Sequence, residues 1–188
     1  MLSKLKLVAA AFVAAGTLLL SGCGGKLPFT QKPPDFNKTY TVTADITFDN
    51  LKAKANLTRV TSDEWEFAFT EPKQLNGLTI KLNSERFAAS LGGLSFSAED
   101  SPVYSAMPQL IAKAVGLLSK VTNESISSSD GVLTISGDLD GHRITVTADE
   151  RTGNLISLKC PHFKLSVNFT DQKPYTYVLP DENGDAIS

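Results

Sequence analysis

Few side chains in this sequence have the types and spacing of a catalytic centre. The chain has two histidines, His142 and His162, and no Gly-x-Ser-x-Gly motif of the kind that presents a serine nucleophile. A hydrolase needs a nucleophile, a base within reach and an orienting acid, and a zinc site needs several closely spaced ligands. Cys160 and His162 stand two residues apart without further ligands beside them. The sequence therefore predicts no catalytic residue, no metal site, no cofactor and no enzyme activity.

Cys23 is the residue with the clearest chemistry, because of the segment that precedes it. Lys4 and Lys6 give a basic start without acids, and residues 7–20 form a 14-residue run without charge. A basic start, a short apolar run and small residues at its exit are typical of a secretory signal peptide. The run is shorter than the roughly 20 residues that span a bilayer as a helix, which disfavours a transmembrane anchor.

The four residues Leu20-Ser21-Gly22-Cys23 resemble the lipobox of bacterial lipoproteins. The resemblance implies that residues 1–22 are removed and that the Cys23 thiol is acylated. The protein would then be held on the extracytoplasmic face of a membrane, at the outer membrane or the cell surface according to the envelope. The alternative is a plain cleaved signal with an incidental cysteine. If Cys23 is acylated, Cys160 has no disulfide partner in the chain, and we expect a buried, inert thiol.

Composition and charge describe one ordinary folding domain. The 188 residues are 41% apolar and carry 18 basic against 20 acidic side chains, a net charge of −2. That balance excludes the basic surface that nucleic acid needs. Residues 23–38 are rich in Gly and Pro and are predicted to form a flexible tether. We expect one domain over 39–180, an acidic tail over 181–188, and a monomer.

From Thr39 onward, apolar and polar residues alternate in the way that strands with one buried face do. Turn sequences such as Gly92-Gly93 and Asp140-Gly141 separate the runs. One segment, 105–120, instead has the 3.6-residue period of an amphipathic helix. No alternation of strands with helices appears, which disfavours a parallel sheet. The predicted fold is mainly β, one curved antiparallel sheet of about ten strands closed by one helix. The strands are predicted within 39–48, 51–57, 64–69, 78–82, 87–91, 94–98, 132–136, 143–148, 154–159 and 163–169.

The buried face of this sheet combines large aromatic residues with many alanines. Alanine leaves space on the concave side of a curved sheet, and protein interiors are packed densely. Two occupants could fill the space, the amphipathic helix alone or an apolar ligand, and the sequence leaves both open.

The order of these features resembles the LolA/LolB-like superfamily. The resemblance rests on the lipobox, the antiparallel meander with a mid-chain helix, and two local motifs. One motif is Trp65-Glu66-Phe67 running towards Pro72, and the other is the turn Asp149-Glu150-Arg151-Thr152-Gly153. The resemblance implies a half-barrel around an apolar cavity that binds a lipid or another apolar molecule, with the helix as a lid. The residues expected to line the cavity are Trp65, Phe67, Phe69, Phe87, Phe96, Met107 and Ile111.

The alternative function is a non-enzymatic interaction module on the cell surface. In this case the core would be filled by the chain itself, and the partner would be a protein or a cell-wall polymer.

Overall fold

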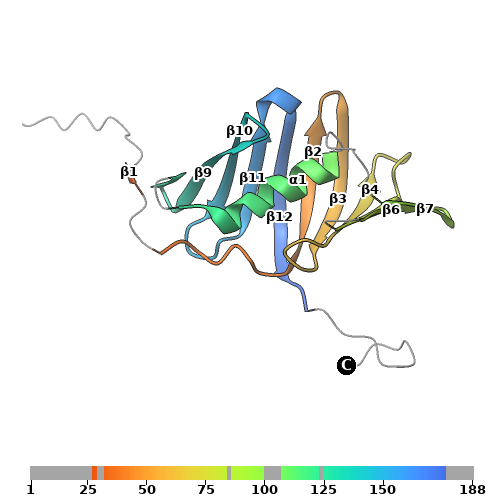
Figure 1. Ribbon diagram of the computed structural model, residues 1–188, viewed down its shortest axis with the longest axis horizontal. Coiled ribbons are helices and arrows are strands. Elements are labelled where there is room, and N and C mark those ends of the chain that lie inside the picture. The colour runs from red at the N-terminus through yellow and green to blue at the C-terminus, as the bar shows by residue number, and fades with distance from the viewer. Residues whose placement is uncertain (1–26, 29–31, 84–85, 100–106, 123–124, 177–188) are drawn as a thin grey trace, which may run out of the picture.

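The structure is a computed structural model, and it describes residues 27–28, 32–83, 86–99, 107–122 and 125–176. One antiparallel sheet of twelve strands, which does not close into a barrel, dominates it (Figure 1). The strands are β1 (Leu27–Pro28), β2 (Tyr40–Phe48), β3 (Leu51–Arg59), β4 (Trp65–Glu71), β5 (Thr79–Leu82), β6 (Arg86–Leu91), β7 (Leu94–Glu99), β8 (Ile126–Ser129), β9 (Val132–Leu139), β10 (His142–Asp149), β11 (Leu155–Cys160) and β12 (Leu165–Pro174).

The sheet is made of two meanders that meet in its middle. The strand order is β1-β8-β9-β10-β11-β12-β2-β3-β4-β5-β6-β7. Strands β2 to β7 follow one another in the chain, and so do β8 to β12. The pairing between β12 and β2, which sets Val167 opposite Ile46, joins the two halves. Strands β1 and β7 are therefore the two edges of the sheet.

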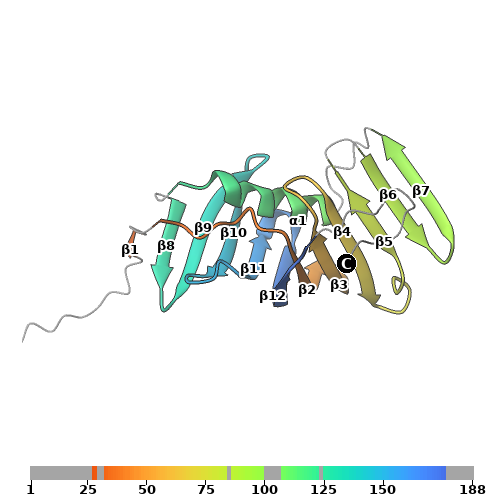
Figure 2. The same cartoon turned by 90° about the horizontal axis from the view of Figure 1, so that it is seen from below.

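The helix α1 (Met107–Gly116) crosses one face of the sheet, which we call the inner face (Figures 1 and 2). A short 3-10 helix, η1 (Leu117–Lys120), continues it. The apolar stripe of α1 is buried, with Leu110 and Ile111 fully inaccessible to solvent. These side chains form one core cluster with the inward-facing residues of the strands. The apolar stripe of α1 thus covers the apolar inner face of the sheet. One helix is therefore enough to build a core.

Residues 32–39, which we call the strap, lie along one end of the strands (Figure 2). Phe36 is 8% exposed and belongs to the core cluster. The backbone oxygen of Phe36 accepts a hydrogen bond from the buried guanidinium of Arg59. At Gly153, which has a φ of +73°, an added Cβ would lie 2.8 Å from the Cβ of Pro34. The last part of the segment predicted as a tether is therefore packed against the domain.

The predicted fold class, a single curved antiparallel sheet with one amphipathic helix, is confirmed. All ten predicted strands are present, as β2 to β7 and β9 to β12. The prediction that the last strand begins at Phe163 is wrong, because Pro161–Phe163 form a 3-10 turn and Lys164 has a left-handed backbone. The prediction also missed β1 and β8. Cys23, the start of the predicted helix before Met107 and the acidic tail lie outside the described residues.

Within the described part of the chain, no helix has the length and apolar character needed to cross a membrane.

Candidate functional site

The residues expected to line an apolar cavity lie in two different environments. Five of them are buried in the core between the sheet and α1, and this group comprises Trp65, Phe67 and Phe69 of β4 and Met107 and Ile111 of α1. Phe67 and Ile111 have no solvent exposure. The middle of the inner face is thus filled by the protein's own helix.

The other two expected residues lie where α1 no longer covers the sheet. Phe87 of β6 is partly buried against the edge of the core, and Phe96 of β7 is 62% exposed. Phe96 of β7 pairs with Ala89 of β6. Ala89 also pairs with Ile80 of β5, and Ile80 pairs with the buried Phe67 of β4. Because directly paired residues share a face, Phe96 lies on the same inner face as the core. Both views show β6 and β7 extending beyond the end of α1 (Figures 1 and 2).

The uncovered part of the inner face is apolar along the whole β6–β7 hairpin. Leu91 and Leu94, opposite one another beside the Gly92-Gly93 turn, are 42% and 80% exposed. We call this surface the open end. It consists of Phe87, Ala89, Leu91, Leu94 and Phe96.

The opposite face of the same hairpin is mostly polar, although it includes Ala88 of β6. Arg86 and Ser90 of β6 and Ser95 and Ser97 of β7 alternate with the residues of the open end, and all four are exposed. An amphipathic hairpin with its apolar face in water exposes a contiguous patch, and such patches mark binding surfaces in soluble domains. The signal for Leu91 and Leu94 was present in the sequence, as two leucines flanking a Gly-Gly turn. The sequence did not reveal that α1 would leave them uncovered.

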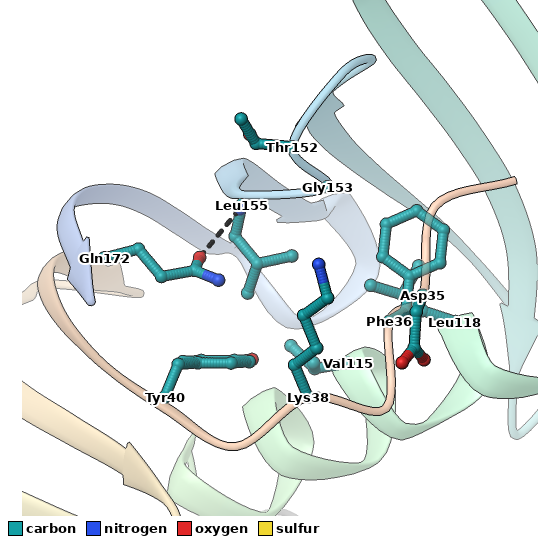
Figure 3. Close-up of a pocket in the computed structure, with 10 residues that line it drawn as sticks. All are labelled: Asp35, Phe36, Lys38, Tyr40, Val115, Leu118, Thr152, Gly153, Leu155 and Gln172. Carbon is teal, nitrogen blue, oxygen red and sulfur yellow. Dashed lines mark hydrogen bonds between the residues drawn. The ribbon is translucent and has the colours of Figure 1, made fainter. Parts of the chain in front are cut away.

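A second site, a small pocket, lies under the strap, where η1 meets the turn before β11. Its open space is about 10 Å³, which is room for about one water molecule. The backbone N–H of Leu155 donates to Oε1 of Gln172 at 2.8 Å across this site (Figure 3). The space is too small for an acyl chain. It is lined by Asp35, Phe36, Lys38, Tyr40, Val115, Leu118, Thr152, Gly153, Leu155 and Gln172.

Two buried polar groups lie beside this second site. The hydroxyl of Tyr40 has no hydrogen-bond partner among the described residues, and its pKa is raised far above the ordinary value because burial disfavours the phenolate. Arg59 is 1% exposed, and its Cζ lies 5.7 Å from the ring centroid of Trp65. Its Nη1 donates to the backbone oxygen of Phe36, whereas its Nε has no partner in the described part of the chain. Arg59 therefore joins β3 to the strap. Arg59 was not among the predicted site residues, although it stands where the alternation of β3 predicts an apolar residue.

The two histidines that the sequence analysis considered, and for which it predicted no catalytic role, lie in an aromatic cluster at one end of β10. The rings of His142 and His162 are stacked with centroids 3.4 Å apart and planes 8° from parallel, and Phe163 meets both rings edge-on. Cys160 is buried, with its Sγ 3.8 Å from the backbone oxygen of Arg143. In the described residues, no three His, Cys, Asp or Glu side chains gather as a metal site would require.

No family model and no curated protein matches this chain. Solved structures do match. An uncharacterized conserved protein from Thermus thermophilus has a TM-score of 0.50 at 7% identity, covering 80% of this chain and 90% of that protein. A LolA superfamily protein from Nitrosomonas europaea has a TM-score of 0.38 at 10% identity, covering 81% and 92%. A putative outer membrane lipoprotein-sorting protein domain from Vibrio parahaemolyticus has a TM-score of 0.36 at 13% identity, covering 78% and 88%. The similarity to the Thermus protein, at 7% identity, is one of fold alone.

Proposed function

We propose that this protein binds an apolar ligand, the acyl chain of a lipid, on the open end of its inner face. The observation that carries the proposal is the exposure of Leu94 and Phe96 on a face that is continuous with the core. The five expected residues that are buried between the sheet and α1 would form the core beside this site and would not touch the ligand. Of the residues expected to touch the ligand, Phe87 and Phe96 keep that role, and Leu91 and Leu94 join them.

The energetics favour one acyl chain held on a surface. Covering a large apolar side chain completely contributes about 1.5–3 kcal/mol. The exposed fractions of Leu91, Leu94 and Phe96 are 42%, 80% and 62%, so covering all three contributes about 3–5 kcal/mol. Each buried methylene of the ligand contributes about 0.8 kcal/mol more. Two strands of six residues offer a strip about 17 Å long and about 10 Å wide. A strip of this size accommodates a single chain.

Lipid on Cys23 would supply the membrane attachment. Two acyl chains hold a protein stably at a bilayer, whereas one chain binds only marginally. The protein would then work at the extracytoplasmic face of a membrane, with the open end available to apolar molecules there.

Binding is tested with palmitate that carries a fluorophore, titrated into the full-length chain with Cys23→Ser in every sample. The double variant Leu94→Ser with Phe96→Ser is expected to weaken binding at least tenfold, because most of the exposed apolar contact is removed. The matched control is Ser95→Ala with Ser97→Ala, which changes the polar face of the same strand. Equal binding by the two double variants would refute the proposal. Mass spectrometry of lipid extracted from the purified acylated protein would identify the natural ligand.

A second candidate function follows from the filled middle of the inner face. A protein whose core needs no ligand fits an interaction module, and the open end would then contact a protein or a cell-wall polymer. Absence of labelled palmitate binding, with the open-end leucines still required for capture of cell-wall material, would favour this second function.

A further inference from the structure

The two edges of the sheet differ in how they are protected against pairing with another strand. At one edge, β1 has only two residues, and Pro28 lacks a backbone N–H. At the other edge, β7 has six residues in unbroken register with β6, from the Leu91–Leu94 pair to the Arg86–Glu99 pair. Among the described residues, β7 pairs with β6 alone. Proline, lysine and β-bulges are the usual features that prevent an edge strand from pairing with another chain. β7 contains none of them.

The hairpin geometry determines which backbone groups of β7 face outward. Gly92 and Gly93 have φ values of +58° and +85°, as the two central residues of a type I′ turn require. The turn bond then joins Leu91 to Leu94. Because the direction of hydrogen bonding alternates along a strand, the backbone groups of Phe96 also point to β6. Those of Ser95 and Ser97 point away from the sheet.

The sequence of β7 is palindromic in residue type around Phe96. It runs Leu94, Ser95, Phe96, Ser97, Ala98, with apolar residues at alternate positions. In an antiparallel pair of two such strands centred on Phe96, each Ser95 falls opposite a Ser97, and each Leu94 falls opposite an Ala98. The outward-facing backbone groups of Ser95 and Ser97 meet one another, and the two Phe96 residues form the close, non-hydrogen-bonded pair.

We propose that β7 is a self-association edge, at which a second copy of this chain adds its own β7 in antiparallel register about a two-fold axis through Phe96. Such an interface is isologous, because the same surface is used by both copies. The pairing joins the two sheets and makes their open ends one continuous apolar surface. Glu99 falls opposite Gly93 of the second copy, so the acidic residues of the two strands do not face each other. The inference is independent of acyl-chain binding, and it differs from the monomer expected from the sequence.

The contact is short, and this determines its strength. One ladder of six-residue strands is smaller than the interfaces of roughly 1,200–2,000 Å² that make stable complexes. We therefore expect a reversible dimer with a dissociation constant on the order of 100 µM.

Sedimentation velocity of the full-length chain with Cys23→Ser, in a mild detergent from about 10 µM to about 1 mM, measures this equilibrium. Ser97→Pro removes an outward N–H without touching the apolar face, and it is expected to weaken dimerisation at least tenfold. Ser97→Ala keeps the N–H and is expected to dimerise as the parent does. Labelled palmitate binding should persist in both variants, which separates a failure of this inference from a failure of the proposed function. Two results would overturn the inference. One is a sedimentation coefficient of the parent that does not change with concentration, and the other is an equal change in the dimerisation constant in Ser97→Pro and Ser97→Ala.

Disulfide trapping tests the register and does not depend on the proline variant folding. In the proposed pairing the two Phe96 Cα atoms lie about 4.5 Å apart, which is within disulfide range. The two Leu94 Cα atoms lie at least about 13 Å apart along the strands, which is beyond that range. Phe96→Cys should therefore form a cross-linked dimer on oxidation, and Leu94→Cys should not. Equal cross-linking by the two variants would refute this register, and cross-linking by neither would refute the pairing.

Discussion

The alanines on the inner face allow a direct test of whether the protein fills its own sheet. Ala55 of β3 has no solvent exposure and stands opposite Ala44 of β2 and Phe69 of β4. If α1 and its neighbours fill this region, the side chain of Ala55→Trp has no space to enter. If the region holds a cavity, the indole ring fits.

The magnitude follows from the packing around Ala55. Inserting extra atoms into a well-packed core destabilises by about 1–3 kcal/mol, and an indole ring in place of one methyl group belongs at the upper end. In a domain of this size, about 3 kcal/mol corresponds to a decrease in Tm of roughly 6–12 °C. Thermal unfolding followed by circular dichroism measures this decrease.

Asn56→Trp is the matched control, because Asn56 is the next residue of β3 and is exposed on the other face. Surface substitutions of this kind change the free energy of unfolding by about 0.5 kcal/mol or less. An Ala55→Trp variant as stable as Asn56→Trp would refute the conclusion that the middle of the inner face is filled. It would place the ligand under α1 and not on the open end.

Three further substitutions test the strap and its surroundings. Gly153→Ala should lower the free energy of unfolding, measured in urea, by about 1–2 kcal/mol or more. The new Cβ would lie 2.8 Å from Pro34, and alanine is strained in the left-handed backbone conformation of this position. Gly137→Ala is the control, because its Cβ would make only ordinary contacts, and it should not cause a comparable loss. Burial raises the pKa of Tyr40, so the unfolded phenol ionises first and stability should fall as pH rises above about 10. Tyr40→Phe should lose that part of the decline in alkaline urea titrations. Arg59→Met should leave global stability nearly unchanged while hydrogen exchange in the strap becomes faster, because it removes both a buried charge and the bond to the strap; unchanged exchange would contradict the role given to Arg59.

The strands were predictable because one face of the sheet is buried and the other is exposed to solvent. That asymmetry imposes the period of two that runs through Tyr40–Phe48 and its neighbours. Strand β8 escaped prediction because Ile126 is its one apolar residue, followed by three serines. Its place in the sheet comes from pairing with β9 and not from a pattern of its own.

The candidate site was predictable only in part, for a different reason. Alternation identifies the face on which Phe67 and Phe96 lie, but it carries no information on which element covers that face. Phe67 is covered by the helix and Phe96 is not, and the difference depends on where α1 crosses the sheet. The burial of Arg59 could not be predicted for the same reason. It depends on the strap, which lies more than twenty residues away in the chain.

The pairing of β12 with β2 has a consequence for how the chain folds. Each meander consists of hairpins between neighbouring strands, so the strands of each can pair through local contacts. Among the described strands, β2 is the first long one in chain order and its partner β12 is the last. Without β12, the meander from β2 to β7 would have an unpaired strand at each side, and pairing with residues 165–174 removes one of them. The two meanders therefore become one sheet only through a contact between strands that lie far apart in the chain.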